Sequence, residues 1–210
     1  MRSDWIKISD SNGENNLLES AIKINRVKGW MQLSNSNGSS SFCYKLGIKK
    51  YNSNEIITEG SLFEGDIYKI LLIEDTTLEQ TEARYFYVFE IDIWGNSKLL
   101  YPGPTQGNVE NYIKCKTRNA EIKDNIIDIG SFRVIRPLGL ENFYLLSTTE
   151  PLPDPSVLKY SGVRTRGKRE SKNPLNAIIS NIGYSTRGEY YNPESWSIDM
   201  YSFLSLEKHK

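Results

Sequence analysis

The segment from Arg84 to Trp94, RYFYVFEIDIW, alternates between two faces with a period of two, and it constrains the fold more than any other part of the chain. On one face of the strand that it predicts, every side chain is large and apolar: Tyr85, Tyr87, Phe89, Ile91 and Ile93. A face of this kind has to be removed from water. We therefore expect a core strand here.

The opposite face of this strand starts with two apolar residues and ends with Glu90 and Asp92. Such a strand should be covered on both faces at one end and should meet water on one face at the other. The Gly95-Asn96 pair that follows favours a tight turn into a second strand over residues 98–101. The sequence thus predicts a hairpin.

Shorter patterns of the same kind recur along the chain, at residues 42–49, 67–73, 126–129, 132–135, 143–146 and 196–206. The run at 67–73 is nearly all apolar, which is typical of a central strand. In the last run, apolar residues of one parity predict a face that joins the same core as the strand over 84–94: Trp196, Ile198, Met200, Leu204 and Leu206.

Residues 17–33 fit two interpretations. Their apolar residues keep helical spacing in part, but they also suit a strand whose parity changes near Asn25-Arg26. We favour the strand. A helix is better indicated over residues 174–182, where Asn173 is suited to cap the first turn and Gly183 to end the last one.

Many short strands, Gly- and Pro-rich turns and one late helix together predict a mainly β fold. We expect an antiparallel β-sandwich, immunoglobulin-like or barrel-like, with one α-helix near residues 174–182. Residues 1–39 would form an N-terminal strand or extension packed on the body. Residues 40–210 would form the sandwich, including the C-terminal helix and strand.

Composition limits the surroundings of the chain. Its 26 basic residues balance 26 acidic ones, so charge favours neither nucleic acid nor an anionic membrane. No apolar run approaches the ~18 residues that span a bilayer, and the N-terminus lacks a secretory apolar region, so we expect a cytoplasmic location. Cys43 and Cys115 could pair, but two cysteines are too few for a disulfide framework in a chain of this size, so we expect buried or half-buried thiols.

Residues suited to catalysis are scarce. The one histidine, His209, stands next to the end of a charged tail, where a frayed terminus cannot hold a general base in place. Without further histidines, the cysteines form no zinc site, and no phosphate-binding glycine motif occurs. Glu90 and Asp92, about 7 Å apart along a strand, are the best-placed carboxylates, but such a pair is usually a solvated face. We expect no enzyme activity, no cofactor and no metal.

Two clusters could bind a partner. A basic loop could contact phosphates or an acidic protein, although it lacks the interleaved aromatics of a single-strand binder: Arg164, Arg166, Lys168, Arg169 and Lys172. A second stretch combines residue types that are enriched in protein-binding hot spots, and it is our expected contact surface: Tyr184, Arg187, Tyr190 and Tyr191.

The order of several motifs resembles a bacterial domain family of unknown function that usually lies C-terminal to a caspase-like (metacaspase-type) peptidase domain. The motifs include GSLFEGDIYK at 60–69, RYFYVFEIDIWG at 84–95, LLYP at 99–102 and RPLGLENFYLLS at 136–147. The resemblance spans about residues 40–205 and implies a β-sandwich accessory domain that regulates or targets a peptidase. It implies no catalytic residues.

Three functions follow as hypotheses. The first is a non-enzymatic domain that binds a protein, with a caspase-like peptidase, in cis or in trans, as the favoured partner. The second is a carbohydrate-binding or carboxylate-dependent hydrolase sandwich, which would need three carboxylates and an aromatic platform around one cleft. The third is a protein substrate that a partner peptidase cleaves, at the basic loop, in a defence or signalling pathway.

Residues 164–172 should form an exposed connection, because five cations crowd there without an apolar anchor. Limited trypsin digestion, followed by mass spectrometry of the fragments, should show the first cut in this segment. Resistance of this segment while other sites are cut would mean that its cations are docked on a partner or on the body of the protein.

Overall fold

The fold is seen in a computed structural model, which describes residues 9, 11–36, 42–75, 83–103, 111–114, 126–152, 155–158 and 196–208. The elements, in chain order, are α1 (Gly13–Ser36), β1 (Tyr44–Lys50), β2 (Ile56–Ile57), β3 (Gly60–Phe63), β4 (Ile67–Glu74), β5 (Arg84–Ile91), β6 (Ser97–Tyr101), β7 (Tyr112–Ile113), β8 (Ile126–Arg133), β9 (Leu140–Thr148), the 3-10 helix η1 (Pro155–Leu158) and β10 (Trp196–Leu206). The helix expected over 174–182 lies outside the described residues.

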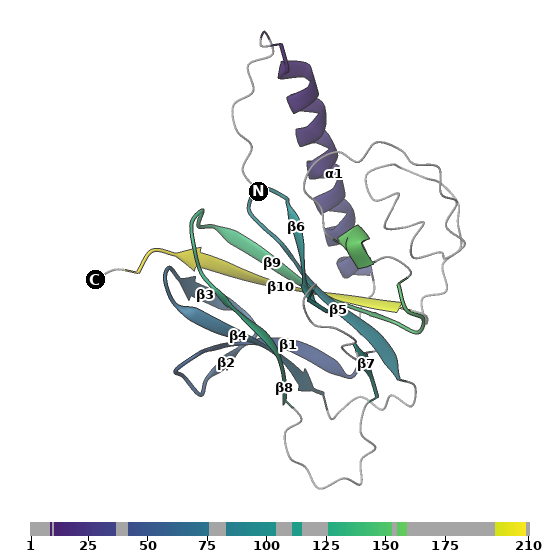
Figure 1. Ribbon diagram of the computed structural model, residues 1–210, viewed down its shortest axis with the longest axis vertical. Coiled ribbons are helices and arrows are strands. Elements are labelled where there is room, and N and C mark those ends of the chain that lie inside the picture. The colour runs from purple at the N-terminus through teal and green to yellow at the C-terminus, as the bar shows by residue number, and fades with distance from the viewer. Residues whose placement is uncertain are drawn as a thin grey trace, which may run out of the picture.

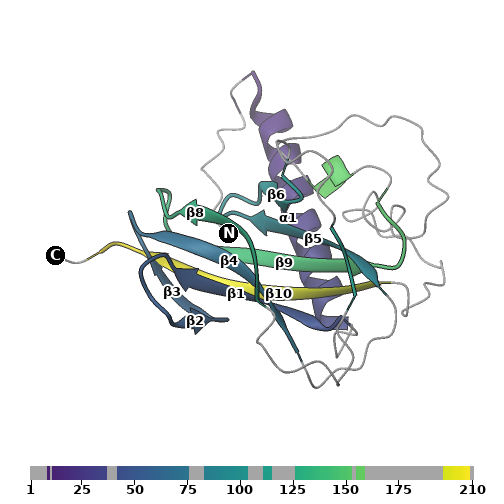
Figure 2. The ribbon, with the colours of Figure 1, turned by 60° about the horizontal axis from the view of Figure 1, so that its bottom comes forward.

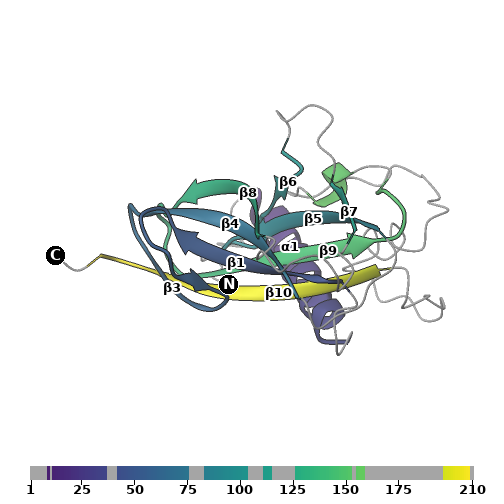
Figure 3. The same cartoon turned by 90° about the horizontal axis from the view of Figure 1, so that it is seen from below.

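The strands form two sheets that pack face to face, and neither sheet closes into a barrel, which confirms the predicted β-sandwich. The four-stranded sheet has the order β2-β1-β4-β8, and the six-stranded sheet has the order β3-β10-β9-β5-β6 with β7 beside β5. Figure 1 shows both sheets, and Figure 3 shows the four-stranded sheet from below. The described pairings are antiparallel except that between β3 and β10, which is parallel.

Most of the strands expected from alternation are present. β5 carries the predicted face from Tyr85 to Ile91 but ends before Ile93, which lies in the turn that follows. β4 is central in its sheet, and β5 and β6 form the expected hairpin, whose turn includes Gly95 at a φ of 78°. The prediction of two separate strands at 126–129 and 132–135 is wrong, because β8 is continuous from Ile126 to Arg133 and ends inside the second range. Its pairing with β4 shifts register between Ile70 and Leu71, and Gly130 absorbs the irregularity at a φ of 149°.

The strand favoured for residues 17–33 is also wrong, since this segment belongs to the helix α1. Asn12 precedes the helix, and the Asn16 amide donates to its carbonyl at 3.0 Å, as in a first helical turn. Val27 and Trp30, one turn apart, face the six-stranded sheet and are buried there. The apolar residues that would require a change of parity in a strand are spaced as expected on one face of a helix. The helix α1 thus packs on the six-stranded sheet, and the predicted extension over residues 1–39 with its boundary stays a prediction.

The first core lies between the two sheets. Leu46, Ile48 and Leu72 of the four-stranded sheet meet Phe143 and Phe203 of the six-stranded sheet, and all five side chains are fully buried. Alternate residues of each strand point into this layer, as a sandwich requires.

A second core lies on the other side of the six-stranded sheet. There Trp30 of α1 packs against Phe89 and Tyr144, with ring centroids 4.9 and 6.2 Å away. Tyr87 accepts a hydrogen bond from the Leu152 amide at 2.8 Å, which holds the chain that follows β9 against the same face. Figures 1 and 2 show α1 against the six-stranded sheet on the side away from the four-stranded sheet. The single core predicted from sequence is therefore two cores, one on each face of the six-stranded sheet.

The expectation of thiols also needs correction. Cys43 is buried as expected, but it is disulfide-bonded.

Replacement of Trp196 by alanine should lower the free energy of unfolding by about 3–5 kcal/mol, because this side chain is only 6% exposed and fills the second core. The matched control is Leu206→Ala on the same strand, where the side chain is 38% exposed and the change should stay within about 0.5 kcal/mol. Chemical denaturation of both variants measures the difference. Equal losses would contradict the burial of Trp196.

Candidate functional site

The outer face of β10 divides into three zones along its length. Trp196, Ile198 and Met200 lie under α1 in the second core. Ser202 comes next and donates to Asn142 of β9 at 2.7 Å. Beyond this polar pair the face continues with apolar side chains that the described residues do not cover.

We call this exposed zone the apolar patch: Phe63, Leu140, Leu204 and Leu206. Their exposed fractions are 38, 46, 43 and 38% in that order. Strand register makes them neighbours, because Leu204 pairs with Leu140 on β9 and Leu206 pairs with Phe63 on β3. Since Leu204 and Leu206 are two residues apart, they share one face. The prediction that these two leucines belong to the core is wrong, since the helix that covers the face ends its contact before them.

Charged side chains border the apolar patch. Arg136 donates from Nε and Nη2 to the two carboxylate oxygens of Glu64, at 2.9 and 3.1 Å, and it also pairs with Glu207 just beyond β10. The planar guanidinium group of Arg136 fixes the directions in which the Glu64 and Glu207 carboxylates point. Arg136 is 63% exposed, so these pairs contribute little to stability and mainly position the rim.

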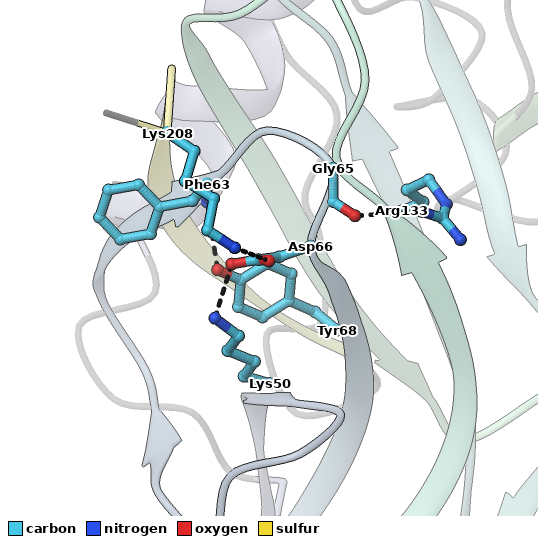
Figure 4. A network of polar contacts seen from close by, with 7 residues as sticks. All are labelled: Lys50, Phe63, Gly65, Asp66, Tyr68, Arg133 and Lys208. Carbon is cyan, nitrogen blue, oxygen red and sulfur yellow. Dashed lines mark hydrogen bonds and ion pairs between the residues drawn. The ribbon is translucent and has the colours of Figure 1, made fainter. Parts of the chain in front are cut away.

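Asp66 forms a second set of ion pairs at the same end of the sandwich (Figure 4). Its carboxylate oxygens accept from Lys50 and from Lys208, each at 2.7 Å, and these hydrogen bonds, that from Lys208 first, lower the pKa of Asp66. Figure 4 also shows Tyr68, whose hydroxyl accepts from the Phe63 amide at 3.1 Å. That bond occupies a backbone donor of β3, which lies at the edge of its sheet. The backbone that carries Phe63 is therefore held in place.

Two carboxyl groups lie on the inner face of the same strands. Glu90 of β5 and Glu141 of β9 are diagonal neighbours, because Glu90 pairs with Phe143, two residues after Glu141. Burial, followed by the charge of Glu141, raises the pKa of Glu90 to about 7, although Lys98 opposes the shift. Burial also raises the pKa of Glu141, and a hydrogen bond with Ser205 partly offsets that effect. Near neutral pH this pair can hold a proton.

Asp92, the predicted companion of Glu90, has a different role. Its Oδ1 accepts from the amides of Trp94 and Asn96 at 2.9 and 2.8 Å, and its Oδ2 accepts from the Asn96 side chain at 2.9 Å. These bonds shape the turn between β5 and β6. The sequence pointed to Asp92, whereas the structure brings Glu141 to Glu90. The available signal in the sequence was Glu141, a single acidic residue just before the apolar segment 143–146.

The other predicted site residues lie outside the described part of the chain. They are the expected contact surface Tyr184, Arg187, Tyr190 and Tyr191, the basic loop Arg164, Arg166, Lys168, Arg169 and Lys172, and the tail residue His209. Their roles stay predictions. The apolar patch was not predicted as a surface at all, although the parity of residues 196–206 contained half of it.

Comparisons with protein-family models, with curated proteins and with solved structures found no match. The resemblance to a peptidase-associated family therefore stays a prediction. Within the described ranges, no helix has the length and apolar character to cross a membrane, and no three acidic, cysteine or histidine side chains are grouped so that they could hold a metal ion.

Replacement of Glu90 by glutamine should stabilise the protein at pH 8 and change little at pH 4.5. The pKa of Glu90 rises from 4.5 to about 7 on folding, so the folded state keeps a proton that the unfolded state releases. The contribution of this group to stability is thus complete below pH 4.5 and is lost as the pH rises to about 7, with a penalty of at most about 3 kcal/mol.

Thermal or chemical unfolding across this pH range measures the effect. The control is Glu55→Gln, a substitution at an exposed residue, which should leave the pH profile of the parent unchanged. A gain for Glu90→Gln that is equal at both pH values would show that removal of the ionised carboxylate is not its cause.

Proposed function

We propose that the chain is a non-enzymatic recognition domain that binds a protein through the apolar patch. The observation that carries this proposal is the row of four exposed side chains on paired strands: Phe63, Leu140, Leu204 and Leu206. Contiguous exposed apolar side chains with a polar border are typical of protein-binding surfaces. The ion pairs of Arg136 and Asp66 keep that border and its backbone in one arrangement, which lowers the entropy lost on binding.

The occupant that fits this surface is an amphipathic segment of a protein, in a helical or extended form. α1 supports this choice, because Val27 and Trp30 already dock an apolar stripe on the same face of the same strands. The apolar patch continues that interface beyond Ser202 and Asn142. A partner segment would cover the leucines as α1 covers Phe89 and Tyr144.

The favoured source of that segment is a caspase-like peptidase, in cis or in trans. This part of the proposal rests on the order of the sequence motifs. The apolar patch supports only the more general proposal that a protein binds there.

The positions of the carboxyl groups give the hydrolase alternative less support than the apolar patch gives protein binding. Asp92 is engaged in a turn, and the remaining pair lies on the inner face, beside Phe143 and Phe203 of the first core. The pKa of Glu90, at about 7, is explained by this burial without any substrate. None of the described residues adds support to the carbohydrate-binding alternative or to the cleaved-substrate alternative.

A Leu204→Ser, Leu206→Ser double variant should bind the caspase-like peptidase encoded beside this chain at least about 30-fold more weakly than the parent does. The fold-change corresponds to about 2 kcal/mol, a typical hot-spot loss. The variant should still fold, because both side chains are exposed. Quantitative binding of the purified proteins measures the loss, and the melting temperature of each variant confirms that it folds.

The matched control is Leu17→Ser, Leu18→Ser on α1, where both leucines are exposed and belong to an element that contributes no residue to the apolar patch. It should bind as the parent does. A Tyr190→Ala, Tyr191→Ala variant tests the surface expected from sequence: loss there with normal binding by the leucine variant would overturn the choice of the apolar patch. No binding by the parent would end the peptidase proposal, and peptidase, nuclease or glycosidase turnover by the chain alone would end the non-enzymatic one.

A further inference from the structure

Cys43 immediately precedes β1 and lies in the first core, where it is 0% exposed and disulfide-bonded. Its carbonyl accepts from the Asp75 amide at 2.6 Å, which fixes it against the end of β4. The chain has two cysteines, so Cys115 is the one partner that its own sequence provides.

Contacts between described residues bring the flanks of these two cysteines together at Phe86 of β5. Phe42 stacks on Phe86 with ring centroids 6.4 Å apart. From the other side, Asn111 binds the Phe86 backbone twice: the Phe86 amide donates to the Asn111 carbonyl at 2.8 Å, and the Asn111 side chain donates to the Phe86 carbonyl at 3.0 Å. Asn111 begins the described segment 111–114, and Cys115 is the next residue.

We infer that a Cys43–Cys115 disulfide ties the four-stranded sheet to the six-stranded sheet and that the chain acquires it in an oxidising compartment. The two thiols release two protons and two electrons to an oxidant that carries a disulfide, which is itself reduced to two thiols. Such bonds persist outside the reducing cytosol and are rare within it. This location replaces the cytoplasmic one expected from sequence, and a caspase-like partner acting in trans would have to meet the domain there.

The position of Cys43 supports a structural bond. With no exposed surface, the sulfur is shielded from thiol reductants while the sandwich is folded. The bond closes a loop of about 70 residues that includes β1 to β7, so it removes a large part of the conformational freedom of the unfolded chain. The inference does not depend on the apolar patch, which lies at the opposite end of β9 and β10 from the pairing partners of Phe86.

The first experiment uses the purified full chain, produced in an oxidising compartment. Thiol titration after denaturation should find no free thiol before reduction and two after it, and non-reducing peptide mapping should link the Cys43 peptide to the Cys115 peptide. Reduction should lower the melting temperature by about 10 °C. A Cys43→Ala, Cys115→Ala double variant should melt near the reduced parent and ignore the reductant. Free thiols in the parent, or a melting temperature that reduction leaves unchanged, would overturn the bond or its structural role.

The second experiment concerns the compartment. Cells that make the chain naturally are lysed in the presence of a thiol-alkylating reagent, and the chain is then separated without reductant. Recovery of the chain with both cysteines unalkylated supports folding in an oxidising compartment. Alkylation of both cysteines would overturn it even if the bond forms in the purified protein.

Discussion

The six-stranded sheet is apolar on both faces, and the rest of the architecture follows from the need to cover it twice. Along β9, Phe143 and Leu145 point to one side while Tyr144 and Leu146 point to the other, and all four are buried. Burying one such side chain is worth roughly 1.5–3 kcal/mol, so neither face can be left to water over its whole length. The four-stranded sheet covers one face, and α1 with Leu152 and Leu158 covers the other.

The two covers do not extend equally far, and this difference creates the candidate site. The α1 side ends its cover at Met200, while β10 continues to Leu206. The outward-facing leucines of that extension cannot turn inward, because the opposite parity is already occupied by Phe203 and Ser205. The apolar patch is thus exposed because β10 extends beyond the part of the sheet that α1 covers. The described residues leave its side chains exposed, and a further layer over them is the role proposed for a partner.

The sequence predicted the strands well because alternation with a period of two is a local property. In β5, four apolar residues on one face sufficed, and the Gly95-Asn96 turn followed. The helix α1 was misassigned because its contact with the sheet rests on few side chains, Val27 and Trp30 above all, amid polar residues. The proximity of Glu90 to Glu141 was also missed, because the register of β5 on β9 creates it and not a local pattern. The disulfide state of Cys43 was missed for the same reason, since no local pattern encodes it.

The two ends of the sandwich are held by different chemistry, and this difference suits the proposed roles. Near the start of β5, Phe42 and Asn111 both contact Phe86, beside the buried, disulfide-bonded Cys43. At the other end, Asp66 and Arg136 hold the chain after β10 through exposed ion pairs, which are individually weak and are screened by salt. These ion pairs keep the border of the apolar patch and its backbone in one arrangement, so less entropy would be lost in the proposed binding. Under the proposed function, the end near Phe86 maintains the sandwich, and the end held by Arg136 and Asp66 presents the apolar patch to a partner.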